Sequence, residues 1–273
     1  MRYPLKSARG ERLESVDLAA DGLVGDRAWA CVDAADGSLG SAKHPRRWAR
    51  LLEVGATSAG PGSDEVLLEV AGRTVHAGSA EADAVLSEHV GREVRLASSV
   101  PAQARLHRQL PDEPAMVPEW TPSAAGAEVV NDLATSKPGG RFTDYGAVHL
   151  LTTGALARLA RQLDRPSVDA ERFRANLVLD LPADPLPGQE LRIGQVVLRV
   201  SLPTPRCLVP ALTAGRPQHL DRELLGVLAR EHRTTVGTMG RAACFGVYAD
   251  VVQPGQLAVG QSVRSSPPGD PSG

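Results

Sequence analysis

The chain has 273 residues, which is long enough to bury one large core or two modest ones without disulfide staples. Thirty Lys and Arg stand against 32 Asp and Glu, a formal net charge of −2, which argues against a surface that coats nucleic acid or an anionic membrane. The three widely spaced cysteines predict no disulfide framework and favour a reducing compartment. The polar start of the chain and the lack of a long apolar stretch argue against secretion and membrane insertion, so a cytoplasmic location is expected.

Short runs with a strand-like pattern recur along the chain and are bounded by turn-forming residues. They cover residues 28–32, 65–70, 93–96, 176–179, 191–200, 245–252 and 256–263. Within 191–200, the pair Gly194-Gln195 predicts the tight turn of an antiparallel hairpin. Barrel-like sheets are built from such hairpins, so the pattern predicts a mainly β protein.

Three segments have helical spacing instead, at 79–90, 153–163 and 220–230. Thr152 or Thr153 can cap the second helix and Asp221 the third, because their side-chain oxygens accept hydrogen bonds from free backbone N–H groups. We expect these helices to cover sheet edges or barrel ends. The predicted class is therefore α+β, mainly β with a few helices.

Residues 101–140 lose this patterning and become rich in Pro, Gly and Ala. We interpret them as a connection between two lobes, either a linker or a loop that frames a site, since long structureless stretches are uncommon inside a compact domain. The tail, residues 265–273, is rich in Pro, Ser and Gly and is predicted to be disordered.

Cys207 stands apart from the other two cysteines. Cys31 and Cys244 lie in apolar settings, where a thiol usually behaves as a small core residue. Cys207 follows Arg206 in a segment stiffened by prolines, and an adjacent guanidinium favours thiolate over thiol. This setting suits a metal ligand or a nucleophile, while the plainer interpretation is a packed cysteine in a proline-rich turn.

Basic and small polar residues occur at breaks between the predicted strands, at 6–7, 25–27 and 172–176. Such donors can converge on a phosphate, although exposed loop charges give the same pattern. The basic cluster 43–48 can form an electrostatic docking patch. The sequence contains no zinc-ligand spacing, no glycine-rich phosphate loop and no serine-hydrolase elbow, so nucleotide hydrolysis and serine-hydrolase chemistry lack support.

Taken in order, these segments resemble the MOSC family, which is named for the C-terminal domain of molybdenum-cofactor sulfurases and includes the amidoxime-reducing component proteins. The resemblance rests on residues 3–7, 22–29, 43–46, 142–144, 149–152, 172–178, 205–207, 245–248, 254–255 and 259–260. It implies an N-terminal MOSC β-barrel-like domain over 1–100, a connecting loop over 101–140 and a MOSC domain over 141–264. The second domain is expected to be a MOSC-type β-barrel with covering helices.

The resemblance implies a molybdenum-pterin cofactor whose metal is bound by the sulfur of Cys207. Because the metal is held mainly by the two pterin dithiolene sulfurs, one protein thiolate is enough to complete its attachment to the protein. The implied cofactor-binding residues are Lys6, Ser7, Arg27, Thr152, Arg174, Asn176, Arg206 and Tyr248. The chain departs from relatives at Thr204, where many have a second cysteine, and at Ala155, where serine is common. The turn that often follows the Arg-Cys element in relatives is also missing. The substrate pocket and the partner-docking surface are therefore the family features that carry over least well to this chain.

Three functions remain open from the sequence. The first is an oxidoreductase that removes oxygen from an N-hydroxylated small molecule, with electrons from a separate ferredoxin, flavoprotein or cytochrome b5-type protein. The second is a sulfur carrier in which Cys207 holds a persulfide. The third is a non-catalytic cofactor-binding module. The family is also associated with pyridoxal phosphate, but this length does not include a desulfurase domain with its pyridoxal-phosphate lysine.

Overall fold

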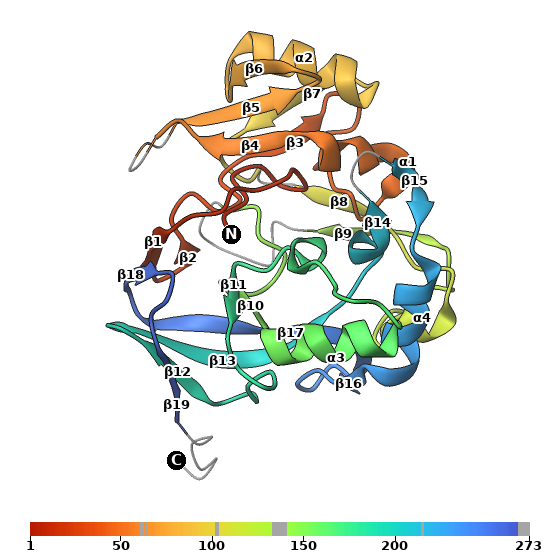
Figure 1. The fold of residues 1–273 in the computed structure, drawn as a ribbon. Helices are drawn as coiled ribbons and strands as arrows, with labels where there is room; N and C mark the ends of the chain where they lie inside the picture. The colour runs from red at the N-terminus through yellow and green to blue at the C-terminus, as the bar shows by residue number, and fades with distance from the viewer. Residues whose placement is uncertain (61–62, 64, 102–103, 133–140, 214–215, 267–273) are drawn as a thin grey trace.

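The computed structural model describes residues 1–60, 63, 65–101, 104–132, 141–213 and 216–266. Strands hold 37% of the residues and helices 20%, so the predicted α+β, mainly β class is confirmed. Figure 1 shows one unit around α2 at one end of the molecule and a larger sheet with α3 and α4 at the other. Among the described helices, none is long and apolar enough to cross a bilayer.

The N-terminal unit contains two small sheets around one helix. β4 (Gly55–Ser58), β5 (Val66–Val70) and β6 (Arg73–His76) form one sheet, and β3 (Ala30–Asp33) pairs with β7 (Val94–Ala97). The helix α2 (Ala80–Val90) begins at Ser79, whose hydroxyl accepts from Ala82 N, and ends at Gly91 in a left-handed conformation. Its buried face packs on Trp48, which lies at the end of α1 (Pro45–Trp48), before the 3₁₀ turn η1 (Ala49–Glu53).

The larger unit is a seven-stranded, nearly closed, barrel-like sheet. Its order is β11 (Leu177–Leu179), β10 (Val148–Thr152), β17 (Arg241–Gln253), β13 (Val196–Pro205), β12 (Glu190–Ile193) and β19 (Val263–Ser265), with β16 (Arg233–Thr235) also paired to β17. The predicted hairpin turn at Gly194 joins β12 and β13. The helices α3 (Thr153–Gln162) and α4 (Arg222–Glu231) cover one face, capped by Thr152 and Asp221 as predicted.

The other face of this sheet packs against strands from both ends of the chain. β18 (Gly255–Ala258) pairs with β1 (Ser15–Ala19), which pairs with β2 (Gly22–Leu23). Leu18, Leu23 and Leu257 from these strands join the same core as Leu150 and Val247 of the large sheet. The N-terminal segment and the end of the chain therefore build one structure together.

Two of the predicted regions have a different structure from the one expected. Residues 256–263, predicted as one strand, are divided by a turn containing Gly260, so that β18 pairs with β1 and β19 pairs with β12. The region 101–140, predicted as a connection without regular structure, contains β8 (Arg105–Gln109) paired with β9 (Glu128–Asp132) and the 3₁₀ turn η2 (Pro114–Met116). Residues 102–103 and 133–140 of this region lie outside the described residues. The predicted disordered tail, 265–273, lies outside them from residue 267 onward, but its first residue, Ser265, is the last residue of β19.

The remaining elements connect α3, β13 and α4. They are η3 (Ala170–Phe173), η4 (Val209–Ala211), β14 (Leu212–Thr213) and β15 (Arg216–Leu220). η3 leads directly into Arg174, and η4 follows Cys207 closely. These short turns therefore fix the ends of the segments that carry two of the predicted site residues.

Candidate functional site

A pocket of about 380 Å³ lies where the N-terminal segment, the β8–β9 hairpin and the large sheet meet. Seven of the eight predicted cofactor-binding residues line it together with Cys207: Lys6, Ser7, Arg27, Arg174, Asn176, Arg206 and Tyr248. These residues come from three regions of the chain that are far apart in sequence. The fold therefore brings the predicted cationic and polar side chains together around one cavity.

Cys207 is half-buried at the wall of this pocket, just after β13 ends at Pro205. The register between β13 and β17 shifts here, because Pro203 lies opposite Val247 but Pro205 lies opposite Cys244. The extra residue in β17 is accommodated at Gly246, which has φ 77°, a bulge of the kind that re-aims neighbouring side chains. Arg206 N donates to Ala243 O (2.8 Å), which anchors the segment that holds Cys207.

The other two cysteines are buried, as the sequence predicted. Cys31 packs in the core of the N-terminal unit, and Cys244, on β17, packs with Val236 and Ala242. Burial raises the pKa of each thiol to about 12. Both are therefore held as neutral thiols away from the pocket.

Three pocket residues have a left-handed backbone conformation that side chains rarely adopt. Ser7, Arg27 and Arg174 have φ values of 66°, 50° and 57°. Such conformations cost free energy and are concentrated at functional sites. Here, backbone hydrogen bonds hold them in place, including Arg27 N to Tyr3 O (2.7 Å) and Arg174 N to Glu171 O (3.0 Å).

Arg27 and Arg174 both lie over the ring of Tyr3, with guanidinium carbons 4.9 and 4.3 Å from its centroid. Arg27 is paired with the buried carboxylate of Asp26, and its Nη2 donates to Arg174 O (3.1 Å). Arg174 donates to Ala8 O (2.5 Å), while its buried Nη2 has no partner in the described structure. Burial and the nearby Arg27 lower the pKa of Arg174 to about 10. This end of the pocket thus presents an unsatisfied cationic donor.

Two lysines share one carboxylate at another part of the wall. Lys6 Nζ donates to Asp144 Oδ1 (2.8 Å) and Phe142 O (2.9 Å), and Lys43 Nζ lies 3.0 Å from Asp144 Oδ2. Burial lowers the pKa of Lys43 to about 8, although Asp144 opposes the shift. Partial desolvation acts to raise the pKa of Asp144, but the two ammonium groups hold it well below its usual range. Asp144 is therefore a carboxylate with a fixed orientation.

A neutral histidine lies behind Arg206. Arg206 Nη1 is 3.4 Å from His149 Nε2, and its Nη2 donates to Phe173 O (3.0 Å). Burial and then the Arg206 charge hold the pKa of His149 well below its usual range, so this ring is neutral. Asn176 accepts from His149 N through Oδ1 (3.0 Å), while Asn176 Nδ2 and Arg206 Nε are buried without a partner in the described residues. Both orphaned donors belong to residues that line the pocket.

Thr152 is the predicted site residue that does not line the pocket. Its hydroxyl donates to Asp184 Oδ1 (2.7 Å) and accepts from Ala155 N (3.2 Å), so both hydrogen-bonding roles serve the start of α3. Arg172, from the basic segment 172–176, is likewise directed elsewhere, to Asp221 and Pro210 O. The predicted role of Thr152 in cofactor binding is not supported by its position.

Four lining residues with a basic, acidic or imidazole side chain were not among the predicted site residues: Lys43, Arg108, Asp144 and His149. Lys43 belongs to the cluster 43–48, which is not a continuous docking patch because His44 and Trp48 are buried and Lys43 faces the pocket. Asp144 and His149 occur within the segments on which the resemblance rests, so their signal was present. Arg108 lies in the region interpreted as a connection.

The fold and pocket define a two-unit β protein with a cation-rich cavity that opens beside a cysteine. The MOSC N-terminal beta barrel domain model matches residues 1–91, and the MOSC domain model matches residues 139–264. The chain belongs to the MOSC-domain family. This confirms the resemblance that the sequence motifs indicated.

Solved structures show weaker similarities. The YuaD protein from Bacillus subtilis has 12% identity over 93% of this chain and 86% of its own, with a TM-score of 0.41. YiiM from Geobacillus stearothermophilus has 18% identity over 45% of this chain and 55% of its own, with a TM-score of 0.32. YiiM from Escherichia coli has 18% identity over 47% of this chain and 57% of its own, with a TM-score of 0.32. No curated protein has a significant match.

Proposed function

We propose that the chain binds a molybdenum-pterin cofactor in this pocket, with the Cys207 sulfur as the protein ligand of the metal. The observation that carries the proposal is a half-buried cysteine in a cavity whose walls hold buried donors without partners. MOSC-domain membership supports the same cofactor class. A sealed apolar environment around Cys207 would have argued against it.

The residues present fit such a cofactor. Its phosphate requires cationic donors, which Arg27 and Arg174 offer, and its ring system requires neutral amide or hydroxyl partners, which Asn176 and Ser7 offer. The partnerless Nη2 of Arg174 and Nδ2 of Asn176 are donors that a bound anion or ring acceptor can satisfy. Lys6, Arg206 and Tyr248 complete the proposed cofactor-binding set, and Thr152 is left out of it.

The proposed reaction is reduction of an N-hydroxylated small molecule. An N–OH group takes up two electrons and two protons, the N–O bond breaks, and an N–H group and water form. The bound cofactor supplies the two-electron chemistry, and a separate ferredoxin, flavoprotein or cytochrome b5-type protein supplies the electrons. We also propose that the protein works in a reducing compartment such as the cytoplasm, because Cys31, Cys207 and Cys244 are free thiols.

Elemental and pterin analysis of the purified chain tests the cofactor proposal. We expect near-stoichiometric molybdenum and pterin in chain expressed where the cofactor is made, and a large loss of molybdenum in Cys207→Ser. Cys244→Ser is the matched control, because Cys244 lies outside the pocket, and it should retain the metal. A metal-free wild-type preparation contradicts the proposal, and a sulfur adduct on Cys207 in that preparation supports a sulfur carrier instead.

A further inference from the structure

The pocket holds far more positive than negative charge. Six cationic side chains line it, namely Lys6, Arg27, Lys43, Arg108, Arg174 and Arg206, whereas Asp144 is the single carboxylate among the described lining residues. Lys6 and Lys43 share Asp144, Arg27 has Asp26, and Arg174 and Arg206 donate to backbone carbonyls. A cofactor phosphate would use only part of this excess, so the pocket retains capacity for a second anionic group.

Arg108 is the lining cation that the described protein leaves without a partner. It lies on β8, no ion pair joins it to a carboxylate among the described residues, and its Nε is buried without a hydrogen bond there. A buried guanidinium nitrogen without a partner is costly, and a ligand acceptor can remove that cost. The neighbouring residues Leu110, Met116 and Trp120 give this side of the pocket an apolar wall.

Arg108 is held beside Lys43. Gln109 N donates to Lys43 O (2.9 Å), which joins β8 to the segment before α1. Lys43 interacts electrostatically with both Arg108 and Cys207. Arg108, Lys43 and Cys207 therefore line the same pocket, and the backbone hydrogen bond at Gln109 joins the segments that carry the two cations.

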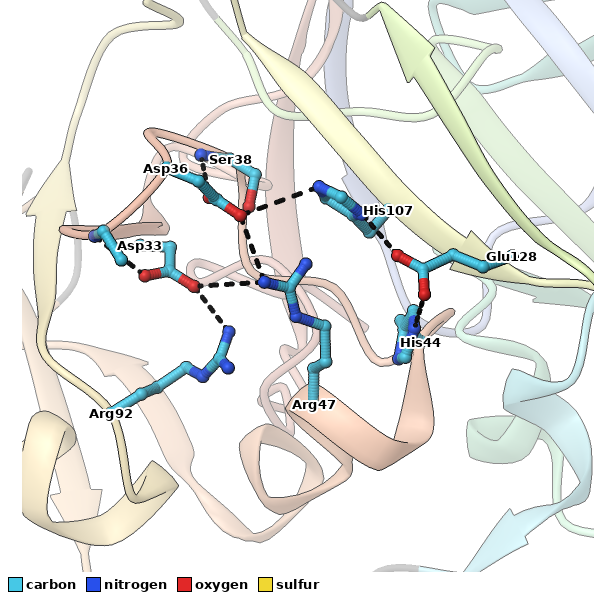
Figure 2. Close-up of polar contacts among 9 residues, drawn as sticks. Asp33, Asp36, Ser38, His44, Arg47, Arg92, His107 and Glu128 are labelled. Atoms are coloured by element: carbon cyan, nitrogen blue, oxygen red, sulfur yellow. Dashed lines mark hydrogen bonds and ion pairs between the residues drawn. The ribbon is translucent and has the colours of Figure 1, made fainter.

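A polar network outside the pocket fixes the backbone that carries these two cations. Figure 2 shows Glu128 between His44 and His107, with Glu128 Oε2 at 3.0 Å from His44 Nε2 and Glu128 Oε1 at 2.6 Å from His107 Nδ1. His44 follows Lys43, and His107 precedes Arg108, so one carboxylate ties together the neighbours of both cations. Arg47 and Asp36 extend the network toward Asp33 and Arg92.

We propose that Arg108, with Lys43 beside it, forms a subsite for an anionic substituent of the substrate, next to the apolar wall that holds the substrate's ring or chain. The preferred substrate is then an N-hydroxylated compound that carries a carboxylate or a similar anionic group. The reaction assignment rests on the proposed function, whereas the preference for an anionic ligand rests on the side chains alone. Arg108 is a specificity-determining residue in this proposal.

Two probes test the subsite by binding. Benzamidoxime is neutral, and 4-carboxybenzamidoxime has the same ring with one carboxylate, so titration calorimetry measures their affinities for the full chain. We expect the carboxylated probe to bind at least about tenfold more tightly, the effect of one charge-assisted hydrogen bond. Arg108→Gln should abolish that preference and leave the affinity for benzamidoxime unchanged, and Arg108→Lys should retain part of it.

Two controls locate the effect. Arg46→Gln removes the same charge from an exposed position on α1 and should retain the preference. Loss of the preference in Arg174→Gln but not in Arg108→Gln would mean that the carboxylate occupies the proposed phosphate end, and it would overturn the subsite. Equal binding of the two probes, absence of binding by both, or an unchanged preference in Arg108→Gln overturns the subsite. Molybdenum analysis of the same preparations tests the cofactor proposal independently.

Discussion

The left-handed conformation at Arg174 allows the backbone and the side chain of this residue to be tested separately. A non-glycine residue at φ 57° carries a conformational cost that glycine avoids. Arg174→Ala and Arg174→Gly both remove the guanidinium, so both should weaken cofactor retention. We expect Arg174→Gly to be about 0.5–1 kcal/mol more stable than Arg174→Ala in urea denaturation. Equal stability of the two variants would show that this conformation carries little strain.

The three thiols should differ sharply in reactivity. Iodoacetamide should modify Cys207 in the native, cofactor-free protein, and should leave Cys31 and Cys244 unmodified because burial shields them and raises their pKa to about 12. Peptide mass analysis before and after denaturation measures this. Cys207→Ser should give no adduct in the native state, and a native-state adduct on Cys31 or Cys244 contradicts the prediction.

The sequence located part of the site for reasons that differ from residue to residue. Cys207 was found because its prolines and Arg206 distinguish it from an ordinary core cysteine, and Lys6, Arg27 and Arg174 were found through the ordered motifs. Lys43 was missed because a basic run resembles an exposed surface, and only the tertiary contacts direct it into the pocket. Thr152 was assigned by resemblance, but its hydroxyl is used at the start of α3.

At the scale of elements, α4 depends on one carboxylate. Asp221 caps the helix by accepting from Leu224 N (3.1 Å), and it binds Arg165 through both oxygens and Arg172 through one. These contacts, with Arg165 the largest contributor, lower the pKa of Asp221. We expect Asp221→Asn to lower the free energy of unfolding by about 2 kcal/mol at pH 7.

The pH dependence of that loss follows from the direction of the pKa shift. Because the folded-state pKa lies below the unfolded value of about 3.9, the stabilisation is complete above the unfolded pKa and is lost as pH falls through the folded one. The difference in the free energy of unfolding between wild type and Asp221→Asn should therefore stay constant from about pH 7 to 5 and become smaller below about pH 4. Urea denaturation across that range measures it, and a difference that widens on acidification contradicts the assignment.

The three main helices were predicted because their signals are local: a 3.6-residue period in each and, for α3 and α4, a capping side chain at the start. β10 was missed because all five of its residues are buried, which leaves no alternation to detect. β8 and β9 were missed for the opposite reason. Their side chains serve a polar network and a cationic pocket, so their sequences resemble a loop.

At the scale of the whole molecule, the two family segments are interlocked. β1 from the N-terminal segment pairs with β18 near the end of the chain, and Leu18, Leu23 and Leu257 complete one core. We expect the fragment 101–273 alone to expose this core and to lack a cooperative unfolding transition. Co-expression with the fragment 1–100 should restore a soluble complex that unfolds cooperatively. A stable, cooperatively unfolding 101–273 fragment contradicts this prediction.

The pairing of β1 with β18 also sets the order of events during synthesis. Ser15 lies opposite Ala258, so β1 cannot pair until the much later strand β18 has also been made. Lys6 and Arg27 emerge first, while Cys207 and Tyr248 emerge much later. A ligand that requires all of these walls can be loaded only after Tyr248 has left the ribosome, so the N-terminal segment alone cannot hold it.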